Sequence, residues 1–336
     1  MKTVEATTPL LELRDVSKQF YKRPDIAQRL VIKLGLAAPP ATVHAVDRAS
    51  IKVFSGEVVG LVGESGCGKS TLGRVAVGLY APTMGQRLWR GQDMAGMTAS
   101  ERRQAQLKLQ MVFQDPYAAL NPRLRVNQIV GEAAVAHRLV DAREQKSFVA
   151  NLLERVGLDP NVSERFPHQF SGGQRARIGI ARALALKSEF LVCDEAVAAL
   201  DVSIQAQVIN LFMQLRQELG LTYLFISHDL GVVRHISDRV VIMYLGRVVE
   251  TADAQALFEN PNHPYTQALL AEAPTLVVKK KTFVAIRGEI PSPLNPPSGC
   301  HFHPRCPHAV ARCAVEAPVL RKIADGHESA CHLNER

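Results

Sequence analysis

Alternating apolar and polar residues mark the first two strand-forming segments of the chain. The alternation runs along Leu10–Phe20 and again along Val43–Phe54, a pattern typical of half-buried strands. Together the two segments predict an antiparallel hairpin arm. The stretch between them, residues 21–42, is basic and contains two adjacent prolines, which indicates a long connection or a lid outside the core.

Farther along, short apolar runs alternate with segments of helical period. Helices are predicted from Lys69 to about Tyr80 and over Val202–Leu219. The apolar runs predict buried strands at Val58–Val62, Leu109–Phe113, Phe190–Cys193, Tyr223–Ile226 and Val240–Tyr244. Strands that alternate with helices predict an α/β fold built on a parallel sheet.

Residues 115–186 interrupt this alternation with a helical pattern. Three periodic segments lie there: Arg125–His137, Ala142–Val156 and Gly173–Leu186. We therefore expect a helical subdomain inserted into the α/β core.

The composition changes again after about His263. Prolines crowd this last part of the chain, which also holds four of the cysteines and few apolar residues. We expect a main domain over residues 1–262 and a separate appendage over residues 263–336.

The overall composition is that of a globular protein. Of the 336 residues, 47% are hydrophobic and 21% are charged, which excludes a disordered or fibrous chain. The net charge of +8 would suit an acidic partner, but the densest basic run is only Lys279–Lys281, so nucleic acid is not predicted. No stretch of about 18 residues lacks charge and no apolar leader begins the chain, so we expect a cytoplasmic protein without a membrane span.

A glycine-rich loop follows the predicted strand Val58–Val62. It reads Gly63-Glu64-Ser65-Gly66-Cys67-Gly68-Lys69-Ser70, with Thr71 behind it, and matches the phosphate-loop pattern of nucleotide-binding proteins. The glycines let backbone amides wrap the β- and γ-phosphates, Lys69 supplies a cation, and the Ser70 hydroxyl is a candidate Mg²⁺ ligand. A strand before the loop and a helix after it are the required context, and they argue against a chance turn.

Two carboxylates end the predicted strand Phe190–Cys193. Asp194 is expected to hold Mg²⁺ through water, and Glu195 to polarise the attacking water as general base. A capping or salt-bridged acidic pair is the simpler alternative. Gln114 and His228 also follow strands, where ligands bind in open sheets, and both are expected to reach the γ-phosphate.

A second phosphate-binding pattern, Ser171-Gly172-Gly173-Gln174, lies at the start of a predicted helix. A hydroxyl and bare amides at the positive end of a helix dipole attract anions. One chain would then own two phosphate sites for one nucleotide. We therefore expect two molecules that share two nucleotides.

These motifs, in their order and spacing, resemble the ATP-binding cassette (ABC) family. The resemblance implies a P-loop NTPase fold with a RecA-like parallel sheet. It also implies a head-to-tail dimer in which Ser171 and Gly173 contact the γ-phosphate held by the opposite subunit. Asp201 joins the nucleotide-binding residues and Gln114 becomes a further Mg²⁺ ligand.

The resemblance also implies an aromatic residue stacked on adenine, which we place at Phe20, with Tyr21 as the rival. Two positions depart from the family pattern. Ala196 stands where a proline usually follows the catalytic glutamate, and Ala198 where a serine is common. No catalytic group is lost, but the loop over residues 196–201 can differ in geometry.

Cys300, Cys306, Cys313 and Cys331 form a C-x5-C-x6-C-x17-C quartet in the proline-rich segment. A reducing cytoplasm disfavours disulfides, while four thiolates suit zinc or an iron-sulfur cluster; free structural thiols are the alternative. The segment resembles that of oligopeptide and dipeptide importers, through residues 263–270 and 291–297. That resemblance implies a [4Fe-4S] cluster, with zinc as the alternative.

The function implied is that of an ATPase subunit of a bacterial ABC importer. Such a subunit powers uptake of di- or oligopeptides, or of related nickel or opine-like solutes, from the cytoplasmic face of the inner membrane. Its implied partners are a homologous ATPase subunit, two transmembrane permeases and an external solute-binding protein. A soluble ABC ATPase acting on DNA or ribosomes is the rival, although such proteins generally carry a coiled coil or a second cassette. A cluster-based sensor is a third class.

Overall fold

The computed structural model describes residues 8–21, 41–115, 117–272 and 288–335. Its core is an eight-stranded sheet with the order β11-β12-β10-β9-β3-β8-β7-β6. Strands β9, β3, β8, β7 and β6 run parallel, and the remaining three pair antiparallel at one edge. The parallel strands are β3 (Val58–Val62), β6 (Leu109–Val112), β7 (Phe190–Asp194), β8 (Thr222–Ile226) and β9 (Arg239–Tyr244). The predicted α/β fold with a parallel sheet is confirmed.

The parallel strands are mostly apolar because both faces of the sheet are covered. Along β7, Phe190 and Val192 join one hydrophobic cluster, whereas Leu191 and Cys193 join another. This alternation is the pleat of a strand with side chains on both sides. Helix α2 (Lys69–Ala76) packs on the first face, and α7 (Val202–Leu219) packs on the second.

The hairpin arm lies on the same face as α2. Strands β1 (Leu11–Tyr21) and β2 (Thr42–Val53) pair antiparallel, as the alternation predicted. Two further strands, which the sequence analysis did not identify, complete a four-stranded sheet: β4 (Met84–Trp89) and β5 (Gln92–Asp93). Of the predicted connection, residues 22–40 lie outside the described residues.

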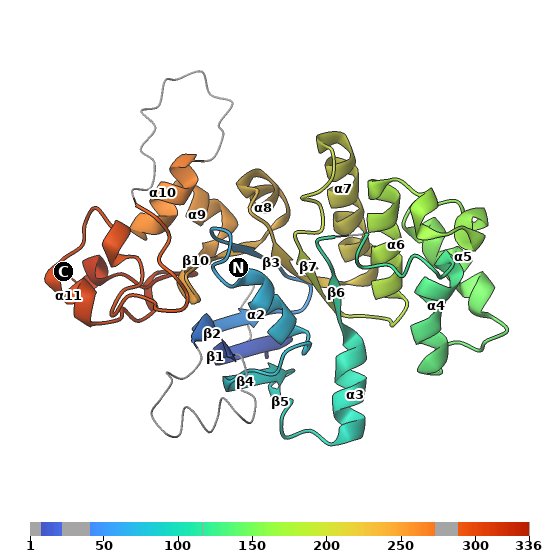
Figure 1. Cartoon of the computed structure of the whole chain (residues 1–336), viewed down its shortest axis with the longest axis horizontal. Coiled ribbons are helices and arrows are strands. Elements are labelled where there is room, and N and C mark those ends of the chain that lie inside the picture. Colours follow the sequence, from blue (N-terminus) through green and yellow to red (C-terminus); the bar gives the residue numbers. More distant parts are fainter. Residues whose placement is uncertain (1–7, 22–40, 116, 273–287, 336) are drawn as a thin grey trace.

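The helical subdomain contains α4 (Val126–Ala136), α5 (Gln145–Arg155) and α6 (Gly172–Leu184). Two short 3-10 turns, η1 (Pro160–Glu164) and η2 (Pro167–Gln169), separate α5 from α6, so the region is not helical throughout. Figure 1 shows this subdomain at one end of the molecule and the C-terminal segment at the opposite end. The other α-helices in the described part of residues 1–262 are α3 (Ala99–Lys108), α8 (Leu230–Ile236) and α9 (Ala254–Glu259).

The C-terminal segment, predicted to be a separate appendage, adds two strands to the edge of the core sheet. Strand β12 (His327–Ser329) pairs with β10 (Arg247–Asp253), and β11 (Arg321–Ala324) pairs with β12. The edge of β10 offers unpaired backbone groups that an added strand satisfies. The segment's helical elements are α10 (Pro264–Glu272), η3 (His303–Arg305), α11 (Ala311–Val315) and η4 (His332–Glu335).

Among the helices in the described ranges, none has the length and apolar character needed to cross a lipid bilayer.

Candidate nucleotide-binding and hydrolysis site

The phosphate loop joins β3 to α2, as the sequence predicted. Gly68 has a φ of +105°, and a Cβ there would lie 2.1 Å from the carbonyl oxygen of Ala45, so only glycine fits. The ammonium of Lys69 donates hydrogen bonds to the carbonyl oxygens of Gly63 (2.7 Å) and Glu64 (3.0 Å). The loop thus closes around a cation at the start of a helix, which is the arrangement that binds phosphates.

Ser70 and Asp194 face each other beside this loop. The Ser70 hydroxyl donates to Asp194 Oδ1 at 2.7 Å. Burial raises the pKa of the Asp194 carboxyl, and the hydrogen bond from Ser70 opposes that shift. A hydroxyl and a carboxylate are the hard oxygen donors that Mg²⁺ prefers, so these two residues fit the ion implied by the motif.

The Glu195 carboxylate meets two side chains from neighbouring strand ends. Gln114 Nε2 donates to Glu195 Oε2 at 2.6 Å, and His228 Nδ1 lies 3.4 Å from Glu195 Oε1. The backbone of Glu195 turns into the left-handed region, with φ of +48°, directly after β7. Such conformations cluster at functional sites. The structure therefore brings together the three residues predicted to act at the γ-phosphate.

The second phosphate-binding pattern begins α6. Ser171 is the N-cap, its hydroxyl accepts from the amide of Gln174 at 3.3 Å, and the Gln174 side chain accepts from the amide of Ser171 at 3.0 Å. Gly173 is buried against α7, and a Cβ at this position would lie only 2.3 Å from the side chain of Ile204. Ser171 and Gln174 are exposed, so this helix start opens to solvent.

This helix start and the phosphate loop of the same chain belong to different parts of the molecule. Helix α6 contributes to the hydrophobic cluster on one face of the sheet, and α2 to the cluster on the other. Within the described ranges, no hydrogen bond joins residues 171–174 to residues 63–71. Asp201, the N-cap of α7, is also exposed.

Phe20 lies near the end of β1 and is half-buried. Its ring meets Tyr80 edge-on, with 5.3 Å between the ring centroids, and the Lys18 ammonium lies 5.2 Å from its centre. Tyr21 is 57% exposed. The adenine-stacking role of Phe20 stays a prediction, and Tyr80 is an aromatic neighbour that the sequence analysis did not single out.

All four C-terminal cysteines line one small cavity of about 40 Å³. Burial raises the pKa of Cys300 to about 11, and the neighbouring thiols of Cys313, Cys306 and Cys331 add to the shift. Over the described residues, no group of three or more His, Cys, Asp or Glu is arranged to hold a metal ion. The four thiols thus lie around one cavity, whereas bound zinc or iron stays a prediction.

Two residues of the C-terminal segment reach the phosphate loop, and the sequence analysis missed both. Arg305 pairs with the carboxylate of Glu64, and the Tyr265 hydroxyl accepts from the Glu64 amide at 2.9 Å. They lie 241 and 201 positions from Glu64. No local pattern could have revealed contacts across that separation.

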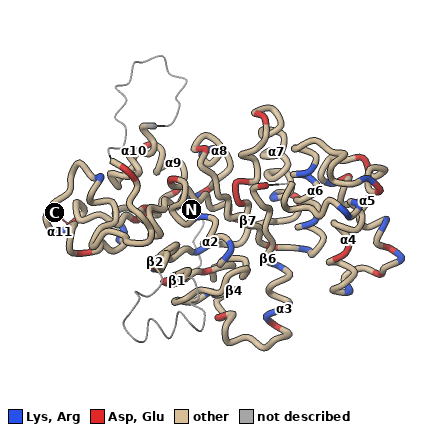
Figure 2. The backbone as a smooth tube through the Cα atoms, viewed as in Figure 1, with Lys and Arg blue, Asp and Glu red and all other residues tan. Residues whose placement is uncertain are grey.

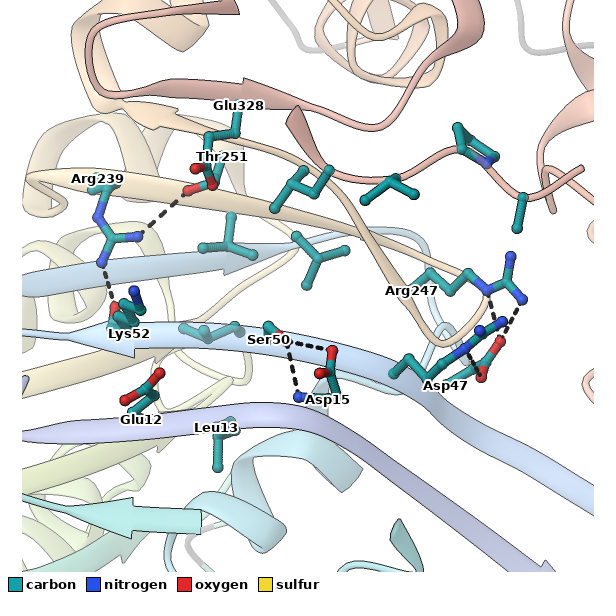
Figure 3. Close-up of a pocket in the computed structure, with 18 residues that line it drawn as sticks. Glu12, Leu13, Asp15, Asp47, Ser50, Lys52, Arg239, Arg247, Thr251 and Glu328 are labelled. Carbon is teal, nitrogen blue, oxygen red and sulfur yellow. Dashed lines mark hydrogen bonds and ion pairs between the residues drawn. The ribbon is translucent and has the colours of Figure 1, made fainter. Parts of the chain in front are cut away.

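Two other hollows lie away from the phosphate loop. A groove of about 710 Å³ runs between the core and the helical subdomain; its lining includes Leu79, Leu107, Phe113, Ala133 and His137. A cleft of about 510 Å³ lies between β2 and β10, and residues 317–320 of the C-terminal segment also line it. Figure 3 shows that charged side chains of this cleft pair with one another, as Arg247 does with Asp47.

Comparison with known protein families gives two matches along the chain. Residues 46–198 match the model described as "ABC transporter". Residues 249–313 match "Oligopeptide/dipeptide transporter, C-terminal region". The first range contains the phosphate loop, Gln114, the helix start at Ser171 and the carboxylate pair. The second contains three of the four clustered cysteines.

Individual relatives resemble the chain over nearly all of its length. The oligopeptide transport ATP-binding protein AppF of Bacillus subtilis is 51% identical, over 96% of this chain and 97% of the relative. A probable peptide ABC transporter ATP-binding protein, y4tS of Sinorhizobium fredii, is 51% identical over 87% of this chain and 83% of the relative.

Solved structures share the fold. The chain is similar to cbiO1 of Clostridium perfringens, part of the ABC transporter complex cbiONQ. The TM-score is 0.61 at 25% identity, over 75% of this chain and 92% of that one. It is also similar to the ATP-binding cassette MJ0796, solved as a dimer bound to ADP and Pi. There the TM-score is 0.61 at 24% identity, over 73% and 98% of the two chains. By its motifs, its fold and its full-length relatives, the chain belongs to the ABC transporter family, among the ATP-binding proteins that carry the oligopeptide/dipeptide transporter C-terminal region.

Proposed function

We propose that the chain is the ATP-hydrolysing subunit of an ABC importer for di- or oligopeptides. The contact that carries the proposal is the convergence of Gln114 and His228 on Glu195, beside the Ser70–Asp194 pair. Hydrolysis of a nucleotide requires a general base next to the phosphate loop and a separate carboxylate that binds the metal ion, and both are present here.

Each side chain then has one task. Lys69 and the loop amides bind the β- and γ-phosphates, while Ser70 and Asp194 hold Mg²⁺, which neutralises phosphate charge. Glu195 accepts the proton of the attacking water as general base. Gln114 and His228 orient that carboxylate through the contacts at 2.6 and 3.4 Å.

The exposed helix start at Ser171 implies a second ATPase subunit. The exposed start of α6 can bind phosphate, and it is not joined to the phosphate loop of the same chain. In the proposed dimer, Ser171, Gly173 and Asp201 complete the site of the opposite subunit. We infer that this subunit is a homologous cassette and not a copy, as the resemblance to peptide importers implies.

The groove between the core and the helical subdomain supports a membrane partner. Leu79, which is 54% exposed, and Phe113 give the groove an apolar lining. Phe113 directly precedes Gln114, so a permease helix seated here would connect with the residue that contacts Glu195. We propose two permeases and an external solute-binding protein as partners, with the chain at the cytoplasmic face of the membrane.

The solute class rests on the relatives and on the C-terminal segment. The closely similar full-length proteins are described as oligopeptide or peptide transport ATP-binding proteins, which favours peptides over nickel or opine-like solutes. Figure 2 shows Lys and Arg around α4 to α6 interleaved with Asp and Glu, and this mixture of charges does not favour the DNA- or ribosome-acting alternative.

The function is tested with the complex purified through a tag on this chain and placed in liposomes. Peptide delivered by the solute-binding protein should stimulate ATP hydrolysis and accumulate inside. The control is the same complex with the non-hydrolysable analogue of ATP. Stimulation by nickel or DNA, but not by any peptide, would overturn the proposed solute class.

Phe20→Ala should raise the KM for ATP by roughly 5- to 100-fold, because stacking of a base on an aromatic ring contributes about 1–3 kcal/mol. Steady-state ATPase assays over a range of ATP concentrations measure the change. Tyr21→Ala is the matched comparison. A larger effect from Tyr21→Ala would transfer the adenine-stacking role to Tyr21.

We further propose that the four cysteines hold a [4Fe-4S] cluster. Their thiols line one cavity, and four cysteine thiolates are the ligand set that holds such a cluster. Cys300→Ser should lose bound iron and the brown absorbance while the ATPase core stays folded. Cys67→Ser, outside the quartet, should keep its iron. Colourless wild-type protein with stoichiometric zinc after anaerobic purification would reject the cluster.

A further inference from the structure

The C-terminal segment contacts Glu64, the second residue of the phosphate loop, through both its side chain and its backbone. Both terminal nitrogens of Arg305 donate to the Glu64 carboxylate, with Nη1–Oε2 at 2.7 Å and Nη2–Oε1 at 2.9 Å. This two-pronged geometry is the strongest form of ion pair between side chains. The Arg305 side chain is only 5% exposed and that of Glu64 18%, so solvent screens the pair weakly.

A second contact holds the backbone of the same residue. The Glu64 amide donates to the hydroxyl of Tyr265, which is fully buried in α10. The Tyr265 ring packs against Tyr244, with centroids 4.7 Å apart, and against Phe302 at 5.4 Å. Arg305 also donates to the Tyr244 hydroxyl at 3.3 Å. Arg305 and Tyr265, which both contact Glu64, are therefore held by the same cluster of packed aromatic side chains.

Every polar group of Glu64 is thus held. Tyr265 binds its amide, Arg305 its carboxylate, and Lys69 its carbonyl oxygen at 3.0 Å. Lys69 is the cation that the loop presents to phosphate, so its position depends on where Glu64 stands. Without Arg305, an unpaired carboxylate would remain beside the triphosphate, and like charges in a weakly screened site repel strongly.

We propose that Arg305 and Tyr265 are positioning residues of the ATP site, so that the C-terminal segment completes the phosphate loop. The inference rests on the proposed ATPase function and extends it to a segment that contributes no group to the chemistry. Arg305 neutralises Glu64 and fixes its side chain, and Tyr265 fixes its backbone. The loop is therefore prepared for phosphates before ATP arrives.

Simple docking of the segment does not account for these contacts. Other side-chain contacts, which do not involve the loop, already attach it to the core. Arg247 of β10, itself paired with Asp47 at 2.6 Å, donates to the carbonyl of Gly299 at 3.0 Å, and His327 pairs with the buried Glu250 at 2.7 Å. Figure 3 shows Arg247 and Asp47 at the edge of the cleft between β2 and β10. Arg247→Gln is therefore a matched control, because its side-chain contact with the segment does not involve the loop.

The test measures the Kd for MgATP by calorimetry on the full-length chain, whose single loop reports without a partner subunit. Arg305→Gln should raise the Kd by about 10- to 100-fold, the range typical of coupling between linked sites. In the assembled transporter, KM for ATP should rise while kcat at saturating ATP stays within about twofold. The double variant Glu64→Gln/Arg305→Gln should regain most of the affinity, because no unpaired carboxylate remains.

Tyr265→Phe removes one hydroxyl and should raise the Kd about 3- to 10-fold, as expected for a lost neutral hydrogen bond. If Arg305→Gln fails to fold, the Kd of Tyr265→Phe alone tests whether the C-terminal segment positions the phosphate loop. Equal Kd values for wild type, Arg305→Gln and Tyr265→Phe would overturn the inference. So would an effect that Arg247→Gln matches, or that the double variant fails to relieve. Wild-type protein that binds no ATP would instead overturn the proposed function.

Discussion

Glu195→Gln should lower ATP turnover by roughly 10²- to 10⁴-fold, the usual cost of losing a general base. Glutamine keeps the size of the side chain and can still meet Gln114, which lies 2.6 Å from the carboxylate. It cannot accept a proton from water. Binding of ATP should persist, because Lys69, Ser70 and Asp194 are untouched, and the ATP-bound dimer should accumulate.

Single-turnover hydrolysis and sedimentation velocity with ATP measure the two effects. Glu189→Gln is the matched control at the opposite end of the same strand. Glu189 pairs with Arg90 and Lys108 on the surface, and its loss should leave turnover within about twofold. Near-normal turnover in Glu195→Gln would remove the general base from this residue.

Ser171→Asp should abolish most ATP hydrolysis by the assembled pair, by at least about 10²-fold, as for loss of a charge-stabilising group in a closed site. Aspartate caps a helix as well as serine does, and a negative charge favours a helix N-terminus. Helix α6 should therefore keep its stability. The same carboxylate, however, stands where the opposite subunit's γ-phosphate must approach.

The Kd for MgATP of the isolated chain should not change, because Ser171 makes its hydrogen bonds with Gln174 at the start of α6. Ser171→Asn caps without charge, and its turnover should fall less than about tenfold. Thermal unfolding checks that all variants fold. A weaker Kd in the isolated Ser171→Asp chain would mean that this helix start serves its own loop, and the shared-site dimer would be wrong.

Residues near one another in sequence made the site predictable. A few consecutive residues define each of three features: the phosphate loop, the carboxylate pair and the capped helix start. Their chemistry can therefore be predicted from the sequence without the fold. Gln114 and His228 could be placed because parallel strands end at one edge of a sheet, and the structure does bring both to Glu195.

Other features depended on contacts that no local pattern encodes. Helix α2 ends at Ala76 and not near Tyr80, because Gly78 turns the chain with φ of +78°. That glycine was a legible stop signal. By contrast, β12 is only three residues long, and its pairing with β10 joins distant parts of the chain. The grip of Arg305 on Glu64 is of the same kind.

The contact between Arg305 and Glu64 can form only late in translation. Glu64 leaves the ribosome 241 residues before Arg305. At about 5–20 residues per second, the phosphate loop waits on the order of ten seconds or more for the side chain that fixes it. A chain released early would carry every residue of the catalytic motifs and yet hold a loop with a loose carboxylate. Competence to take up ATP would thus arrive with the last part of the chain, so that truncated products compete poorly for the nucleotide.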